Sequence, residues 1–198
     1  MYKFICVLFS IIVIGISCKN KQENKPSVNN TQSDSTTSFP IMELFREDAN
    51  DAEKTPYFKY KITTQAGQKK RLDSVALTID DFSKIIAPLM KIDVSSKTEK
   101  GKYKEIAFHD LSTKSYSVIT TAIEKNTELK SMTALLNDET NKLKSIYFVT
   151  EKESADTASR ITYFWKVNKS LRIVRSIQVK GQLKETIEFI NWNDTENQ

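Results

Sequence analysis

Much of this chain alternates apolar and polar residues in short segments. The alternating positions that share a face are Ile106 and Phe108; Tyr116, Val118, Thr120 and Ala122; Met132, Ala134 and Leu136; Ile161, Tyr163, Trp165 and Val167; Leu171, Ile173, Arg175, Ile177 and Val179; and Leu183, Ile187 and Phe189. A period of two predicts strands. Turn formers separate the segments, as at residues 137–142 and 180–181, and such short connections allow only antiparallel neighbours. Residues 57–64, 72–79 and 143–150 read as further strands, the first two around a turn at Ala66-Gly67.

One segment has the period of a helix instead. Its apolar residues recur on one helical face: Phe82, Ile85, Ile86, Leu89 and Met90. This spacing predicts an amphipathic helix over residues 80–90. Thr78 and Asp81 have the spacing of a capping box at its start. Pro88 cannot donate a backbone hydrogen bond, so we expect the helix to kink there or to end near Ala87.

These patterns together predict an α+β fold that is mainly β. We expect an antiparallel meander of about seven to nine strands, forming a curled sheet or half-barrel packed on the helix at residues 80–90. Residues 41–54 are compatible with a short additional helix near the N-terminus. The predicted domain covers residues 40–193 and is followed by a tail at 194–198.

Three consecutive aromatic residues, Tyr163, Phe164 and Trp165, place large side chains on both faces of one predicted strand. Two interpretations are open. Both faces can belong to the core, which we favour because a helix covers one of them, or one face can be a platform for a ligand.

The N-terminal segment has the layout of a secretory signal peptide. Lys3 precedes an almost unbroken apolar run from residue 4 to 16, and the polar residues Ser17 and Lys19 follow close behind. This run is shorter than the about 20 residues that a membrane-spanning helix needs. We therefore expect residues 1–17 to be cleaved.

The sequence at the expected cleavage site is Gly15-Ile16-Ser17-Cys18. It resembles the lipobox of bacterial lipoproteins, in which a small residue precedes an obligatory cysteine. The resemblance implies that Cys18 receives a lipid, palmitate included, and becomes the new N-terminus, so that the membrane is a partner. Asn20 does not resemble an inner-membrane retention signal. We therefore expect a cell-envelope protein, anchored in the outer membrane and facing the periplasm.

Residues 18–39 contain the predicted lipidated cysteine and a tether. Residues 19–39 are rich in Asn, Ser, Thr, Gln and Lys and cannot bury enough apolar surface to fold. Such a tether has a root-mean-square span of about 25 Å.

The charge and the cysteine content limit which disulfides and which binding partners are expected. Removing residues 1–17 lowers Lys+Arg from 30 to 29 against 25 Asp+Glu, so the formal net charge falls from +5 to +4. The same cleavage removes Cys6 and leaves Cys18 as the last thiol, so no internal disulfide can form. An exported domain does not meet nucleic acid. Its modest positive charge either solvates the surface or binds anionic envelope groups.

Several kinds of site are excluded by composition. Gly67, Gly101 and Gly181 each stand alone, so no phosphate-binding glycine loop exists and we expect no nucleotide cofactor. His109 is the only histidine, which rules out a zinc site of the Cys/His type, and we expect no metal and no other cofactor. Residues 137–142 carry oxygen ligands but lack the spacing of a calcium loop.

No catalytic residues are predicted. His109, Asp110 and Ser112 are close in sequence, but adjacent residues of a strand point to opposite faces and no nucleophile elbow is present. Two pairs of acids, Glu151 with Glu153 and Asp80 with Asp81, read as loop acids and helix-capping acids rather than as a glycosidase pair.

The leading hypothesis is a non-enzymatic lipoprotein whose domain binds or carries an apolar or envelope ligand. Its general shape resembles periplasmic lipoprotein-carrier and lipocalin-like domains, in which a curved sheet holds a helix or an apolar ligand. The alternative is a structural or assembly accessory that binds another envelope protein through a strand edge or through four basic positions: Arg160, Lys166, Arg172 and Arg175. A carboxylate-dependent glycan hydrolase is a remote third hypothesis.

Overall fold

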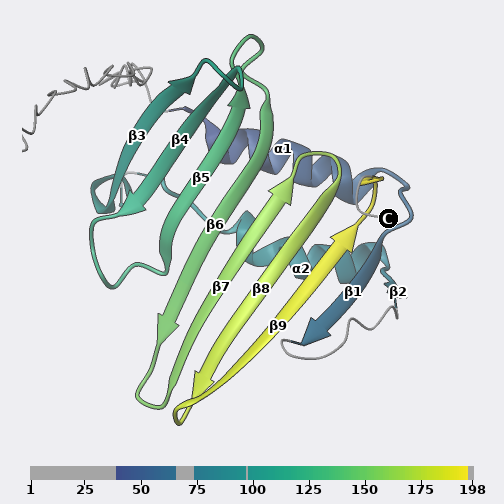
Figure 1. The fold of residues 1–198 in the computed structure, drawn as a ribbon, viewed down its shortest axis with the longest axis vertical. Helices are drawn as coiled ribbons and strands as arrows, with labels where there is room; N and C mark the ends of the chain where they lie inside the picture. The colour runs from purple at the N-terminus through teal and green to yellow at the C-terminus, as the bar shows by residue number, and fades with distance from the viewer. Residues whose placement is uncertain (1–38, 66–73, 97, 196–198) are drawn as a thin grey trace, which may run out of the picture.

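The computed structural model describes residues 39–65, 74–96 and 98–195. Within them, nine strands form one antiparallel sheet, and two α-helices lie behind it in the view of Figure 1 and cover one face. The helices are α1 (Ile41–Lys54) and α2 (Ile79–Met90), with a 3₁₀ turn at Lys100–Lys102. The strands are β1 (Tyr60–Gln65), β2 (Ser74–Ala76), β3 (Tyr103–Asp110), β4 (Ser115–Ala122), β5 (Leu129–Asn137), β6 (Leu143–Glu153), β7 (Thr157–Lys166), β8 (Ser170–Val179) and β9 (Gln182–Asn191).

The sheet is an antiparallel meander. Strands β3 to β9 are neighbours in chain order, β1 pairs with β9, and β2 pairs with β1. β2 and β3 form the two edges, so the sheet curls without closing into a barrel. This arrangement confirms the predicted α+β, mainly β fold and its predicted number of strands. It adds that α1 is a full helix of 14 residues packed on the same face as α2.

Short turns explain why consecutive strands pair. Lys180 and Gly181 connect β8 to β9 with φ angles of 48° and 83°. Two successive positive φ angles are typical of a type I′ hairpin turn, whose twist matches that of the strands. Asn141 and Asn168, both with φ of 54°, stand in the β5–β6 and β7–β8 turns. Asparagine tolerates this left-handed conformation better than most residues, so these turns fix the antiparallel register.

The core is an aromatic cluster between the helices and the sheet. Phe45 of α1 contacts Trp165 and Phe148 edge-on, with ring centroids 5.2 and 5.3 Å away. Phe82 of α2 meets Trp192 at 5.5 Å, and Trp192 lies 4.9 Å from Trp165. Edge-to-face aromatic pairs each add about 0.5–1.5 kcal/mol beyond the area they bury. The cluster therefore holds both helices on the same face of the sheet.

Helix α2 begins as predicted. The Thr78 hydroxyl accepts a hydrogen bond from the Asp81 backbone N–H at 3.1 Å, and the Asp81 carboxylate accepts one from the Thr78 N–H at 3.2 Å. The predicted helix at residues 80–90 is confirmed, and of the two alternatives for Pro88 the end near Ala87 is wrong, because the helix continues through Pro88 to Met90. A proline so close to the end removes only one helical hydrogen bond, so ending there is not required.

The two N-terminal strands differ from their predicted limits. β1 starts at Tyr60 rather than at residue 57, and the strand predicted at 72–79 ends at Ala76, with residues 72 and 73 outside the described residues. Thr78 and Ile79 belong to the cap and first turn of α2, where the capping box outweighs their β propensity. The predicted turn at Ala66-Gly67 lies outside the described residues.

Among the described residues, no helix lies on the second face of the sheet. Trp165 is fully buried and Tyr163 is 3% exposed, whereas Phe164 lies on the opposite face and is 41% exposed. The prediction that both faces belong to the core is therefore wrong for Phe164. We call this side the uncovered face.

Helix α1 is also held by polar contacts. The indole Nε1–H of Trp165 donates to Asp48 Oδ2 at 2.6 Å, and the Asn168 N–H donates to the same oxygen at 3.2 Å. Burial raises the pKa of Asp48 above its ordinary value, although both hydrogen bonds oppose this shift. Asp48 thus joins α1 to β7 and to the β7–β8 turn.

Substitutions of Asp48 test this contact. Asp48→Ala leaves two donors without an acceptor and should lower the free energy of unfolding by about 1–3 kcal/mol. Asp48→Asn keeps an acceptor oxygen and avoids burying a charge, so we expect it to stay within about 1 kcal/mol of wild type near neutral pH.

Because the folded pKa of Asp48 lies above the ordinary 3.8, wild type should lose stability relative to Asp48→Asn as the pH rises through the folded pKa. Urea unfolding across pH measures both effects, and equal losses in the two variants would contradict this role.

Candidate functional site

The helices cover only part of the sheet, and a groove opens beside the C-terminal end of α2. The groove has a volume of about 1030 Å³ and is open to solvent. One wall is formed by α2 and the segment that follows it, and a second by residues 124–129. The strands β6, β7 and β8 form its floor, where they extend past the helices.

The floor of the groove has an apolar part, which lies beside the polar and charged residues Thr150, Lys152, Ser159 and Arg175. Ile161 and Tyr163 of β7 lie beside each other on the helix-covered face, and Leu129 of β5 borders them. Pro88 and Ile92 contribute apolar surface from the opposite wall. These side chains come from segments that are far apart in the sequence, and the meander brings them together.

Charged side chains form the rim and are mostly paired. Lys152 lies 2.9 Å from Glu128, which joins β6 to the 124–129 segment. Arg175 Nε donates to Glu188 Oε2 at 3.1 Å, and Lys61 Nζ lies 3.4 Å from the other oxygen of the same carboxylate. Arg175 is therefore a cation on the floor of the groove, held in place by Glu188.

Tyr163 places a hydroxyl group next to this cation. Burial raises the pKa of Tyr163, and the nearby Arg175 opposes the shift. Tyr103 also lines the groove, and burial raises its pKa, with Glu99 and Glu128 adding to the effect. Both phenols stay protonated at neutral pH, so they can donate hydrogen bonds to a ligand.

The wall that follows α2 is fixed by local hydrogen bonds. The Arg46 guanidinium of α1 donates to the backbone oxygen of Ile92 at 2.6 Å. Asp93 accepts bonds from the backbone N–H groups of Ser95 and Ser96 at 3.0 and 3.2 Å, and these bonds lower its pKa. These hydrogen bonds hold this wall of the groove in place.

The structure separates the residues of the predicted His-Asp-Ser sequence. His109 Nε2 lies 3.1 Å from Asp138, and the imidazole stacks on Tyr116 with ring centroids 4.3 Å apart. The Asp110 carboxylate instead accepts from the Ser112 hydroxyl at 2.6 Å, and such hydrogen bonds lower its pKa to about 2. Ser112 therefore bonds to Asp110 in the β3–β4 turn and does not reach His109.

The paired acids have structural roles as well. Glu151 forms an ion pair of 2.9 Å with Arg160 on the uncovered face, where Glu153 also lies. Asp81 belongs to the capping box, and Asp80 pairs with Lys84 at 2.6 Å.

The turn at residues 137–142 is held by its own asparagine. Asn137 Oδ1 accepts from the backbone N–H groups of Glu139 and Thr140 at 3.1 and 2.8 Å. The described residues contain no group of three His, Cys, Asp or Glu side chains that could hold a metal.

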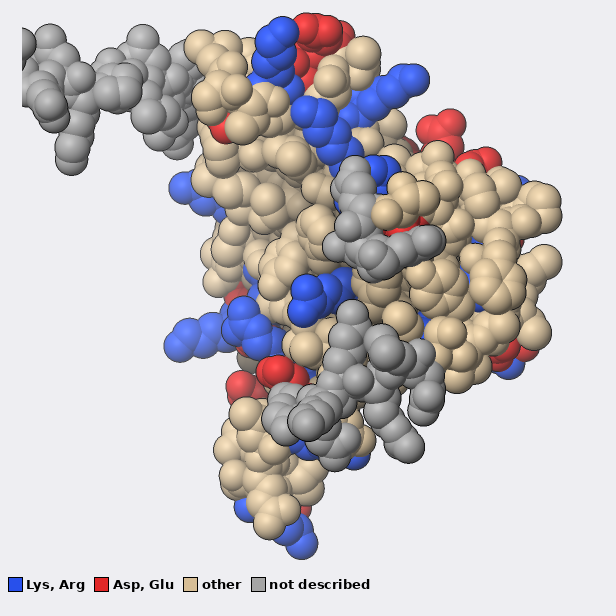
Figure 2. All heavy atoms as spheres, turned by 45° about the vertical axis from the view of Figure 1, so that its right-hand side comes forward, with Lys and Arg blue, Asp and Glu red and all other residues tan. Residues whose placement is uncertain are grey.

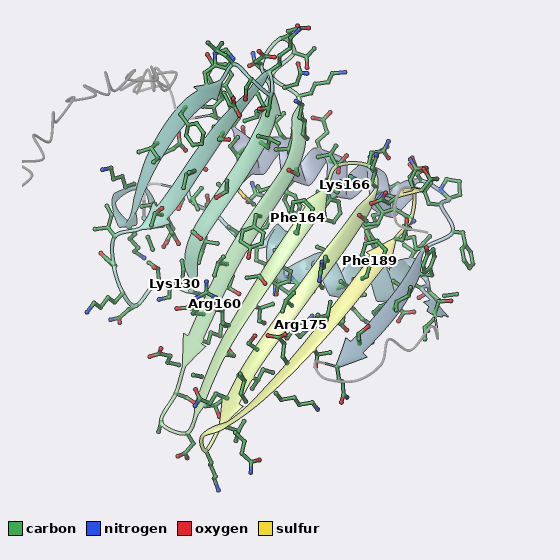
Figure 3. All side chains as sticks on the ribbon, in the orientation of Figure 1. Lys130, Arg160, Phe164, Lys166, Arg175 and Phe189 are labelled. Carbon is green, nitrogen blue, oxygen red and sulfur yellow. The ribbon has the colours of Figure 1, made fainter. Side chains whose placement is uncertain are left out.

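The four basic positions do not form one patch. Arg160, Lys166 and Arg172 lie on the uncovered face, whereas Arg175 lies on the helix-covered face. Lys166, which is labelled in Figure 3, forms an ion pair with Asp194 at 3.4 Å. Figure 2 shows Lys, Arg, Asp and Glu side chains scattered between broad areas without charge.

Sequence reasoning missed Lys59, which is 3% exposed. Its ammonium donates to the backbone oxygen of Thr55 at 3.0 Å and lies 5.4 Å from the centre of the Phe82 ring. Burial lowers its pKa, and Glu53 opposes the shift. Because Lys59 binds a carbonyl just past the end of α1, we assign it a capping role.

No protein-family description, no curated protein and no solved structure matches this chain. Among the described helices, neither is both long and apolar enough to span a bilayer. Cys18 lies outside the described residues.

Proposed function

We propose that this chain is a lipid-anchored binding domain of the cell envelope, and that it holds an amphipathic ligand with an apolar chain in the groove beside α2. The observation that carries the proposal is the combination of apolar side chains with a fixed cation in one groove. Ile161, Pro88 and Ile92 offer apolar surface for an acyl chain, and Arg175 offers a partner for an anionic or polar head. The groove is at the upper end of the usual volume of small-molecule sites, about 300–1,000 Å³.

The packing of the core directs the ligand to the groove. Phe45, Phe82 and Leu89 are fully buried and fill the space between the helices and the sheet. An acyl chain under the helices would have to displace these side chains, whereas the groove is already open. The proposed site is therefore at the end of α2 rather than beneath it.

The assignment of a binding role rather than catalysis rests on how the reactive side chains are used. His109 pairs with Asp138, Asp110 closes a turn, and Asp81 caps a helix. Each of these groups has a structural partner. We therefore propose a non-enzymatic domain.

The lipid anchor can be tested in the bacterial envelope. Wild type should incorporate labelled palmitate and sediment with membranes, because Cys18 follows the predicted lipobox. Cys18→Ala should do neither. Cys6→Ala is the matched control and should behave as wild type, since Cys6 lies in the predicted signal peptide. Palmitate labelling of Cys18→Ala would contradict the anchor.

Ligand binding can be tested with cis-parinaric acid, a fluorescent fatty acid, added to the mature chain carrying Cys18→Ser. Ile161→Asp places a charge on the apolar floor and should weaken binding about tenfold or more, equivalent to about 1.4 kcal/mol. Val179→Asp is the control, because Val179 is on the same face, 46% exposed and outside the groove. Thermal unfolding checks that both variants fold. Equal binding by wild type and Ile161→Asp, or no binding by wild type, would contradict the proposed ligand class.

A second candidate function, an accessory that binds another envelope protein, is favoured by the outer edge of β3, which pairs with no strand of the described residues. The Ile123 N–H donates to the Lys102 oxygen at 2.7 Å, which sets the alternation of hydrogen bonds between β3 and β4. The backbone groups of Tyr103, Glu105, Ala107 and His109 then point away from the sheet. An extended segment of a partner could pair there by strand addition. Native mass spectrometry that finds no bound lipid would favour this candidate.

A further inference from the structure

A row of apolar side chains crosses the uncovered face from one side of the sheet to the other. The strand register places its members next to one another: Ile62, Phe189, Phe164, Tyr147, Ile119 and Ile106. Two other residues occupy positions in the same line, Arg172 on β8 and Thr133 on β5. We call these eight positions the apolar row (Figure 3 labels two of them).

The apolar row is accessible. Ile106, Tyr147 and Phe164 are 39%, 40% and 41% exposed, and Ile119 and Phe189 are half-buried. Single exposed apolar residues are ordinary on a soluble protein, but a contiguous set marks an interaction surface. In the described residues no helix covers this face, so the row is not part of the core.

The exposed charges next to the row are positive, and the nearby Asp194 is buried and paired with Lys166. Arg172 is exposed between Phe189 and Phe164, and Lys104 lies two residues from Ile106 on the same face. The acids on the strand positions of this face are Asp110, Glu151, Glu153 and Glu185. Each lies four or more residues along its strand from the row. The surface therefore fits a partner that is both apolar and anionic.

We propose that the apolar row docks on the surface of an anionic phospholipid bilayer. Acyl chains would receive the rings of Tyr147, Phe164 and Phe189, and lipid phosphates would pair with Arg172. Aromatic residues and arginine are typical of the membrane–water interface. Charge complementarity selects this partner over an uncharged apolar surface, because an isolated Arg172 would be costly to bury against the latter.

The length of the chain between Cys18 and the described domain favours the same partner. This step rests on the proposed lipid anchor at Cys18. About 20 residues separate Cys18 from Phe39, which allows a root-mean-square span of about 25 Å. An anchored domain meets its own bilayer at high effective concentration, so weak docking is enough. The groove lies on the opposite face of the sheet and would point away from the bilayer.

Vesicle sedimentation tests the proposal on the mature chain carrying Cys18→Ser, which has no acyl chain. It should bind vesicles of phosphatidylcholine mixed with phosphatidylglycerol more strongly than vesicles of phosphatidylcholine alone, and added salt should weaken the binding. Tyr147→Ser with Phe164→Ser should reduce binding to the mixed vesicles about tenfold. Leu183→Ser is the matched control, because Leu183 is on the same face and 69% exposed but outside the row. It should bind as the parent does.

Arg172→Glu provides a second variant at an exposed position, where folding is not at risk. It should abolish the preference for phosphatidylglycerol. The proposal is overturned if the parent does not bind mixed vesicles, or if the row variants bind as well as the parent. It is also overturned if the row mediates a concentration-dependent dimer instead.

The outcome of the vesicle test does not depend on the outcome of the tests of the proposed function. Ile161→Asp in the groove should leave vesicle binding unchanged. Failure of this docking test would leave the palmitate and cis-parinaric acid results as they stand.

Discussion

The contact between Trp165 and helix α1 is the interaction on which the rest of the structure depends. The indole ring packs edge-on against Phe45, and its N–H group donates to Asp48 at 2.6 Å. Trp192 and Phe82 extend the same cluster to α2. Without this cluster, no aromatic contacts would hold the two helices on the same face of the sheet. Its position near one end of the long strands determines which part of that face remains open.

The two functional proposals follow from that asymmetry. Where the strands β6 to β8 extend past α2, the helix-covered face becomes the groove, with Arg175 held at its floor by Glu188. No helix of the described residues covers the other face, so the residues that alternate with the core form the partly exposed apolar row. A single sheet thus presents two different surfaces in opposite directions. A lipid tether at Cys18 would allow both to be used at once, one against the bilayer and one toward the periplasm.

Local patterns in the sequence predict most of the fold, because they involve neighbouring residues. The period of two locates the strands, and the Thr78–Asp81 spacing locates the start of α2. The period of two does not indicate which face of the sheet the helices cover. For this reason the prediction that Phe164 belongs to the core is wrong. The groove joins α2, residues 124–129 and β7, which are distant in sequence. One local feature of the sequence pointed to the groove: Arg175 stands among apolar residues on the same face of β8.

The central claim is that the helices cover one face of the sheet and leave the other open. Two neighbouring residues of β7 test it most directly, since Trp165 is fully buried and Phe164 is 41% exposed. We expect Trp165→Ala to lower the free energy of unfolding by about 3–5 kcal/mol and Phe164→Ala to lower it by less than about 1 kcal/mol, as measured by urea denaturation. Equal losses, or a larger loss for Phe164→Ala, would contradict the assignment of faces on which both proposed surfaces depend.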